Sequence, residues 1–305
     1  MIITGKKFSK PKMSRVKNGD IVLPEEKITE KRERLDHVLV KKFPQYNRST
    51  LQNFIKSGFV SVDGKKITKP NAEIITEKNN QENKLTIGLK IPKKKKPADL
   101  TKLKIFEDDN VLVLNKPAGL LSMAKGEFTT EPTLEDYGLL VHRLDRDTSG
   151  VVILAKNAAT QSMLRRQFQE RKAHKIYYAI VEGKPKNEEA LIDLPISRNL
   201  KRPTTFLVDP NGKTAQTYYK LIETKNGKSL LELKPITGRT HQLRVHLKYI
   251  GCPIVGDRLY NPTSKAKRLF LHAKSLEITI PDSPENARKV FSTSIPPDFK
   301  NELGK

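Results

Sequence analysis

A set of polar residues that could carry out acid–base or nucleophilic chemistry lies in residues 139–150, which read LLVHRLDRDTSG. Apolar runs flank these polar residues on both sides, a pattern that predicts two strands joined by a sharp turn. Asp145 stands in this turn, between Arg143 and Arg146. A carboxylate on a tight turn is held in place, so Asp145 is the candidate catalytic group. The alternative is that Asp145 and Asp147 only cap the turn, as aspartates commonly do.

The stretch KIYYAIVEG, residues 175–183, predicts a strand that carries Tyr177 and ends at Gly183. The stretch alternates as a β-strand does, which places Tyr177, Ala179 and Val181 on one face. Tyrosines in strands more often belong to the core than to a site. At a site, the ring could stack on a nucleic-acid base, because every base offers a π-face.

Residues 240–250 follow a turn and carry apolar side chains at helical spacing, which predicts a helix. His241, Gln242 and Arg244 lie near the first turn of this helix. A guanidinium beside an aspartate in a cleft keeps it ionised, whereas burial alone would favour the protonated form. The alternative for His241 and for His246 is a local hydrogen bond, as buried polar groups usually have one.

The composition favours a protein that binds an anion. The chain of 305 residues has 58 Lys and Arg against 34 Asp and Glu, a formal net charge of +24. Neutralising phosphates releases condensed counterions, so nucleic acid is the first candidate partner and an anionic membrane the second. No apolar run is long enough to span a bilayer, and no signal-peptide core follows the N-terminus. The single cysteine, Cys252, excludes an internal disulfide and fits a reducing cytoplasm.

Composition and turn residues divide the chain into four parts. Residues 1–33 form a basic, flexible arm that could bind RNA or remain a solvated tail. Residues 34–91 form a small domain, and residues 92–100 are a linker rich in lysine and proline. Residues 101–300 form a second, larger domain that contains all the candidate catalytic groups.

In the small domain, apolar spacing predicts two short helices, with Ser49 as the N-cap of the second. FVSVDGKKI then predicts a hairpin that turns at Asp63-Gly64. In the larger domain, a buried strand at 111–114 leads into a turn at KPAG, whose Lys116 could touch RNA. We also predict a helix over 157–171, and strands paired around Asn226-Gly227. Lys201 and Arg202 are further candidates for phosphate contacts.

HRLDRDTSG resembles the signature of the RluA-type family of pseudouridine synthases, and the resemblance places the family's catalytic aspartate at Asp145. The string KIYYAIV resembles the family's KxYxAxV motif and places its active-site tyrosine at Tyr177. TGRTHQLRVH resembles the third motif, where Arg244 best matches the basic residue that meets the aspartate and Arg239 is the second choice. RLFLHAKSLEI is similar to the family's closing strand and places Leu271 against the base.

The order helix, helix, hairpin over about residues 34–78 resembles an S4 RNA-binding domain. The resemblance implies an α+β fold, in which a small S4-like domain precedes a synthase domain with a mixed, mainly antiparallel sheet flanked by helices. The implied substrate-binding residues are Arg143, Leu271, Arg239, His241 and Lys116, and the RNA-binding residues of the S4-like domain are Arg34, Arg48 and Lys56.

A pseudouridine synthase breaks the bond from N1 to C1′ of uridine and rejoins the base through C5. No redox change occurs, so we expect no cofactor, in keeping with the lack of a dinucleotide loop or a P-loop. The six histidines lack the spacing of a zinc site, so we expect no metal. The pattern leaves open whether Asp145 attacks C1′ or removes the C2′ proton.

S4-bearing members of the family commonly modify ribosomal RNA. We therefore expect large-subunit (23S-type) ribosomal RNA as the substrate, with tRNA second, and a cytoplasmic monomer. Two other readings stay open. One is an RNA-binding or ribosome-assembly factor without catalysis. The other is a membrane-surface protein, against which the lack of a strongly amphipathic basic helix argues.

Overall fold

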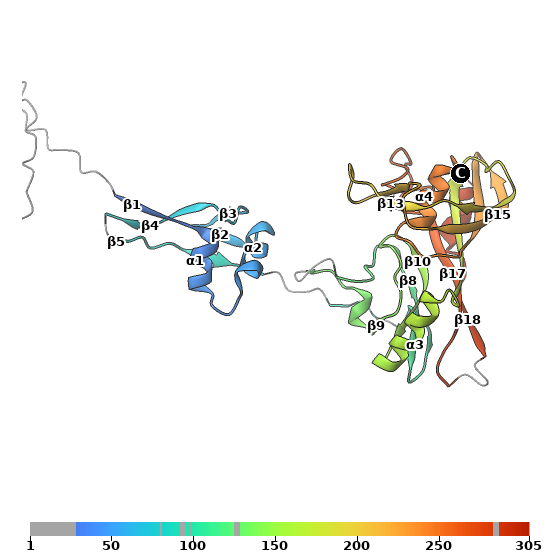
Figure 1. Cartoon of the computed structure of the whole chain (residues 1–305), viewed down its shortest axis with the longest axis horizontal. Helices are drawn as coiled ribbons and strands as arrows, with labels where there is room; N and C mark the ends of the chain where they lie inside the picture. Colours follow the sequence, from blue (N-terminus) through green and yellow to red (C-terminus); the bar gives the residue numbers. More distant parts are fainter. Residues whose placement is uncertain are drawn as a thin grey trace, which may run out of the picture. The chain divides into compact units, whose positions relative to one another are not determined.

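In the computed structural model of the protein, residues 29–79, 81–91, 96–97, 99, 101–124, 129–282 and 287–304 are described. The chain forms two compact units, Met1–Pro92 and Lys93–Lys305 (Figure 1). The basic arm predicted over 1–33 and the linker predicted over 92–100 lie mostly outside the described residues.

The first unit packs two short helices with two small antiparallel sheets. Its helices, which contact each other, are α1 (Leu35–Lys42) and α2 (Arg48–Lys56). One sheet has the order β1-β4-β5 and the other β3-β2-β6. The strands are β1 (Glu30–Arg34), β2 (Val60–Val62), β3 (Lys65–Ile67), β4 (Glu73–Lys78), β5 (Gln81–Glu82) and β6 (Ile87–Leu89). The fully buried side chains of this unit include Leu35, Leu39, Leu51 and Ile55, which are the apolar positions of the two predicted helices.

The structure confirms the hairpin predicted in this unit, but it contradicts the predicted N-cap of the second helix. The hairpin of β2 and β3 turns at Asp63 and Gly64, whose φ angles of 48° and 77° suit a tight two-residue turn. The predicted N-cap of α2, however, was wrong. Asn47 caps the helix, because its Oδ1 accepts a hydrogen bond of 2.8 Å from the Thr50 N–H, and Ser49 lies inside the first turn.

The second unit is built on a ten-stranded mixed sheet. The strand order is β12-β15-β16-β11-β17-β10-β8-β7, with β18 paired to β17 and β9 paired to β10. Its strands are β7 (Lys104–Glu107), β8 (Val111–Lys116), β9 (Leu139–Leu140), β10 (Ser149–Ala155), β11 (His174–Glu182), β12 (Glu189–Asp193), β15 (Gln216–Lys225), β16 (Lys228–Pro235), β17 (Leu271–Thr279) and β18 (Arg288–Ser292). Within this sheet, β10 and β17 run parallel and the other paired strands run antiparallel.

Helices flank the sheet (Figure 1). Helix α3 (Ala158–Gln169) contacts β10 and β17, α4 (Gln242–Tyr249) contacts β15, and α5 (Pro297–Leu303) contacts β16. A short 3-10 helix, η1 (Leu134–Asp136), and a separate hairpin of β13 (Ile196–Arg198) and β14 (Phe206–Val208) complete the unit. The predicted α+β architecture, a mixed and mainly antiparallel sheet flanked by helices, is thereby confirmed.

Both faces of the central strands are buried, which explains their continuous apolar runs. In β8, Val111 and Val113 join one apolar cluster, which also contains Leu164 of α3, while Leu112 and Leu114 join another. A strand buried on both faces shows no alternation of apolar and polar residues. The pattern at 111–114 therefore predicted a buried strand but not the partners on either side.

The parallel pair β10 and β17 brings two distant parts of the sequence together. Ser149 pairs with His272 and Gly150 with Ala273, so the loop before β10 lies next to the start of β17. Gly150 has a φ of 115°, and a Cβ there would meet the Ala273 carbonyl oxygen at 2.1 Å. Only glycine fits this close approach of two backbones.

We predict that Gly150→Ala lowers the free energy of unfolding of the second unit by about 3 kcal/mol or more, because a backbone clash adds to the strain at positive φ. The control is Gly227→Ala, where φ is 73° but nothing lies within 4 Å of the added Cβ. Strain alone should cost about 1–2 kcal/mol there. Denaturant unfolding of both variants checks this, and equal losses would contradict the packing argument.

Candidate active site

Asp145 opens a tight turn at the end of a loop. The loop runs from residue 141 to residue 148 between β9 and β10, and the Thr148 N–H closes the turn by donating to the Asp145 carbonyl oxygen at 3.1 Å. The predicted order of strand, turn and strand is correct. The connection is longer than the predicted sharp turn, because β9 ends at Leu140.

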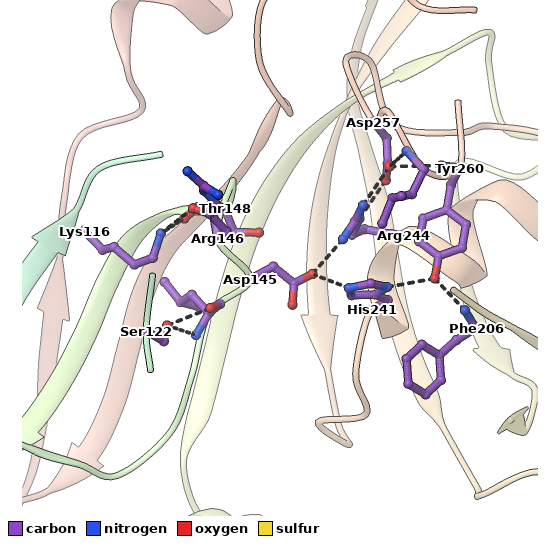
Figure 2. Close-up of polar contacts among 12 residues, drawn as sticks. Lys116, Ser122, Asp145, Arg146, Thr148, Phe206, His241, Arg244, Asp257 and Tyr260 are labelled. Atoms are coloured by element: carbon purple, nitrogen blue, oxygen red, sulfur yellow. Dashed lines mark hydrogen bonds and ion pairs between the residues drawn. The ribbon is translucent and has the colours of Figure 1, made fainter. Parts of the chain in front are cut away.

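Lys116 holds this turn from inside the protein. Its Nζ donates to the carbonyl oxygens of Pro117 at 3.0 Å and of Arg146 and Thr148 at 2.8 Å each. The side chain is fully buried, and burial lowers the pKa of Lys116 to about 7 despite the nearby carboxylates of Asp147 and Asp145. Lys116 therefore offers no surface to RNA, which differs from the substrate contact predicted for it. Figure 2 shows its contacts with the turn.

A guanidinium lies between two carboxylates at the centre of the site (Figure 2). Arg244 donates from Nε to Oδ2 of Asp257 at 2.7 Å and from Nη2 to Oδ1 of the same residue at 2.8 Å. Its Nη1 donates to Oδ2 of Asp145 at 3.1 Å. The two parallel bonds to Asp257, which is almost fully buried, fix the plane of the guanidinium. Nη1 is thereby directed at Asp145.

The start of α4 places Arg244 against the turn. Gln242 anchors the helix to the sheet, because its Nε2 donates to the Gln216 carbonyl oxygen at 2.9 Å while its Oε1 accepts from Thr237 Oγ1 at 2.6 Å. His241, the residue before the helix, has a φ of 57°, a conformation that costs energy in any residue other than glycine. The chain thus turns sharply before α4, and the first helical turn faces Asp145.

The charges of the site stabilise one another. Burial lowers the pKa of Arg244, but the hydrogen bonds and charge of Asp257, followed by the charge of Asp145, outweigh it and raise that pKa above its ordinary value. The Arg244 side chain is only 8% exposed, whereas that of Asp145 is 20% exposed. Asp145 is therefore the member of this cluster that both meets the guanidinium and reaches the cleft.

A second chain of hydrogen bonds approaches Asp145 through His241. The Phe206 N–H donates to Oη of Tyr260 at 2.8 Å, and Oη lies 2.8 Å from Nδ1 of His241. A hydroxyl group can donate one hydrogen bond and accept two, so the Tyr260 hydroxyl can bond Nδ1 in either tautomer of His241. Burial lowers the pKa of His241, against the opposing charge of Asp145, which favours the neutral ring. The second ring nitrogen, Nε2, faces the aspartate. This nitrogen is 3.8 Å from Oδ2 of Asp145.

A cavity of about 560 Å³ brings together the residues predicted for the substrate, with the exception of Lys116. Its volume suits a nucleotide-sized ligand. Burial and the charge of Asp145 raise the pKa of Tyr177, so the phenol stays neutral. The predicted residues that line the cavity are Asp145, Tyr177, Arg244, Arg143, Arg239, His241 and Leu271.

Three residues that the sequence analysis did not select belong to the site. Asp257 orients Arg244, Tyr260 hydrogen-bonds His241, and Lys175 lines the cavity with a pKa that burial lowers to about 8. Asp257 and Tyr260 stand three residues apart, shortly after the apolar stretch at 252–255, and this pattern could have indicated a functional loop. No motif or spacing along the chain links Asp257 to Arg244, the arginine that it orients, so the sequence did not predict this pair.

In the first unit, the predicted RNA-binding arginines surround a buried carboxylate. Asp36 is fully buried and accepts from Arg34 Nε at 3.0 Å, Arg48 Nη2 at 2.9 Å and Gln52 Nε2 at 2.7 Å. Burial raises the pKa of Asp36, but these hydrogen bonds outweigh it and hold that pKa far below its usual range. Lys56, in contrast, is exposed in the last turn of α2.

Over the described ranges, no group of three or more His, Cys, Asp or Glu side chains could hold a metal ion. None of the helices in the described part of the chain has the length and apolar character needed to cross a membrane.

The second unit thus presents a carboxylate and a guanidinium at a cavity, and the chain also carries a small helix–hairpin unit with exposed basic residues, an arrangement that favours an enzyme acting on RNA. Residues 110–249 match the RNA pseudouridylate synthase family, and residues 33–74 match the S4 domain. The chain is 35% identical over 295 residues to the ribosomal large subunit pseudouridine synthase D of Borreliella burgdorferi, with 87% of each chain covered. It therefore belongs to the RluA-type family of pseudouridine synthases and is an RNA pseudouridine synthase, an isomerase.

Other relatives agree with this assignment. Over 190 residues the chain is 43% identical to the dual-specificity RNA pseudouridine synthase RluA of Escherichia coli, which covers 58% of this chain and 86% of the relative. The solved structure of human RNA pseudouridylate synthase domain containing 1 superposes with a TM-score of 0.56 at 28% identity, covering 66% of this chain and 87% of that one.

His142 makes the stability of the second unit depend on pH. Its Nε2 accepts from the Ile153 N–H at 3.2 Å, and its ring stacks on Phe168 at 4.5 Å between centroids. Burial lowers its pKa to about 3, below the ordinary value of 6.5. Below pH 6.5 the unfolded chain therefore binds a proton that the folded protein does not, and stability falls as pH falls towards 3.

We predict that His142→Gln, which keeps an acceptor for Ile153 but cannot be protonated, removes this loss. From about pH 7.5 to about pH 5, the wild type should lose about 2 kcal/mol more than the variant. Denaturant unfolding at both pH values measures the difference. Parallel losses in the two proteins would show that His142 titrates alike when folded and unfolded.

Proposed function

We propose that this protein converts uridines of large-subunit ribosomal RNA to pseudouridine and that Asp145 is the catalytic group. The observation that carries the proposal is the bond from Arg244 Nη1 to Asp145 Oδ2 at the wall of the cavity. Both contacts of the Asp145 carboxylate given above, with Arg244 and His241, use Oδ2. Oδ1 is then the oxygen that meets the sugar.

The proposed chemistry breaks the bond from N1 to C1′ and forms the bond from C5 to C1′. The proton that leaves C5 is balanced by the proton that N1 gains, so no electrons are exchanged. Attack on C1′ and removal of the C2′ proton would both use Oδ1 of Asp145. Arg244 supplies the positive charge beside this carboxylate throughout. Its own plane is held by Asp257.

The cavity walls would hold a uridine that has left its stack. Tyr177 offers a ring face and Leu271 an apolar surface, and both line the cavity with Asp145. Taking a base out of a helix costs a few kcal/mol, which stacking on such walls offsets. Arg143 and Arg239, both exposed at the cavity, would meet phosphates.

Ribosomal RNA is the favoured substrate because the relative aligned over 87% of this chain carries that substrate in its name. The dual-specificity relative covers a smaller part of this chain. The second candidate substrate is tRNA, which the family resemblance offers after ribosomal RNA. We further propose that residues 34–91 are the RNA-binding domain and residues 101–300 the synthase domain, with 1–33 as a basic arm and 92–100 as a linker. Every proposed site residue comes from one chain, so a monomer suffices for the reaction. We propose that this monomer acts in the cytoplasm.

We predict that Asp145→Asn lowers pseudouridine formation by at least about 10³-fold, because the amide neither attacks nor accepts the proton, while RNA affinity stays within about twofold. Carbodiimide-dependent stops of reverse transcription on ribosomal RNA measure the product. Asp147→Asn in the same turn is the matched control and should stay active. An active Asp145→Asn protein would refute the catalytic assignment, and a wild type without activity on ribosomal RNA would refute that substrate.

A second prediction concerns the first unit. If exposed Lys56 meets a phosphate, Lys56→Gln should reduce the slope of log affinity against log salt concentration by about one. The matched control is Lys41→Gln on α1, because Nζ of Lys41 already pairs with Oε2 of Glu33 at 2.6 Å. Filter binding of ribosomal RNA over a salt series gives both slopes. The proposed contact fails if the two variants give the same slope as the wild type.

A further inference from the structure

A second cavity, of about 270 Å³, lies next to the substrate cavity. Tyr260 lines it, whereas His241 and Arg244, which contact Tyr260, line the substrate cavity. The ring of Tyr260 is 5.6 Å from the ring of His241 and 5.0 Å from the guanidinium carbon of Arg244. Figure 2 shows Tyr260 and Phe206 on the side of His241 away from Asp145. The two cavities therefore share a wall of side chains.

The lining of the second cavity combines ring faces with positive charge. Phe206 of β14, Tyr249 at the end of α4 and Tyr260 supply the rings, and Arg202 and Lys248 supply the charge. None of the residues that line it is acidic. In the described part of the chain, neither Arg202 nor Lys248 is paired with a carboxylate, although Lys248 Nζ lies 5.9 Å from the Tyr260 ring centroid. The side chain of Tyr249 stands 61% exposed at this cavity.

We propose that this cavity binds a second, unpaired base of the RNA substrate, next to the uridine that is isomerised. Aromatic faces with neighbouring cations are the usual platform for single-stranded bases and their phosphates. The cavity is about half the volume of the substrate cavity, which suits one base better than a larger ligand. Sequence-specific RNA recognition works largely through splayed bases of loops, so this site would help to select the target loop.

Charge decides between RNA and a protein partner. A protein segment seated here would need an acidic or apolar side chain to match two cations at an aromatic cavity. RNA supplies both the stacking base and the phosphates along one strand, and the chain as a whole carries a net charge of +24. The inference rests on the uridine occupying the substrate cavity, as proposed above. It does not depend on which ribosomal or transfer RNA is modified.

The first test changes Tyr249, which lines the second cavity and is not among the residues that line the substrate cavity. Tyr249→Ala should raise KM for the RNA about tenfold, the scale of one stacking interaction, and leave kcat unchanged. Tyr249→Phe keeps the ring and should restore KM. The substrate is a transcript of the ribosomal RNA segment in which the wild type forms pseudouridine. An unchanged KM in Tyr249→Ala would overturn the proposal.

The second test locates the base. Synthetic RNAs with a single abasic nucleotide at each position near the target uridine are compared in the wild type and in Tyr249→Ala. One abasic position should raise the KM of the wild type about tenfold and have little effect in the variant, because both changes remove the same contact. Additive effects at every position, or a protein rather than RNA bound at this surface, would overturn the assignment.

Ultraviolet crosslinking with the Asp145→Asn protein separates this inference from the proposed chemistry. RNA adducts on the peptides that contain Tyr249 or Phe206 are expected whether or not Asp145 is the catalytic group. Adducts confined to residues of the substrate cavity would overturn the second site and leave the catalytic proposal intact. Activity retained by Asp145→Asn would overturn the catalytic proposal and leave the second site intact.

Discussion

The arrangement of the active site depends on one buried guanidinium held between two carboxylates. Asp257 takes two of the donor groups of Arg244, and the remaining direction of the fork points at Asp145. Removing one partner of a buried ion pair costs about 3–5 kcal/mol, because the other charge is left without compensation. Replacing Arg244 would therefore destabilise the protein as well as remove the contact with Asp145. The three residues come from α4, from the loop after it and from the turn before β10, so this one interaction ties together segments about 100 residues apart.

The turn that carries Asp145 is held as firmly as the arginine that meets it. Lys116 binds three carbonyl oxygens beneath it, and Gly150 allows β10 to approach β17 closely enough for parallel pairing. The first unit also contains a buried charge with hydrogen-bonded partners, but there the contacts stabilise the packing of its helices. There Asp36 is buried among Arg34, Arg48 and Gln52, which fixes the helices against each other. In both units a buried charge is compensated by short hydrogen bonds, and other basic residues stay exposed.

The neighbourhood of Asp145 also explains why its two oxygens differ. Oδ2 faces Nη1 of Arg244 and Nε2 of His241, while the hydroxyl of Tyr260 holds the other ring nitrogen of that histidine, Nδ1. Tyr260 is thus placed between the residues around Asp145 and the second cavity. A base bound there would touch the ring whose hydroxyl orients His241.

Local sequence predicted many structural features of this protein, and there is a physical reason why it did not predict the others. Apolar periodicity and turn residues predicted helices α1 to α4, the hairpins at Asp63-Gly64 and Asn226-Gly227 and the strand of Tyr177, because these depend on neighbours within a few residues. Motif resemblance placed Asp145, Tyr177, Arg244 and Leu271 in one cavity. The N-cap of α2 is a local contact, and there the prediction chose Ser49 although Asn47, two residues earlier, is the cap. Only the tertiary structure decided that Lys116 is buried under the turn and that Asp257 and Tyr260 hold the site. Those outcomes depend on which distant donor or acceptor a side chain meets once the sheet has formed, and no spacing along the chain records that.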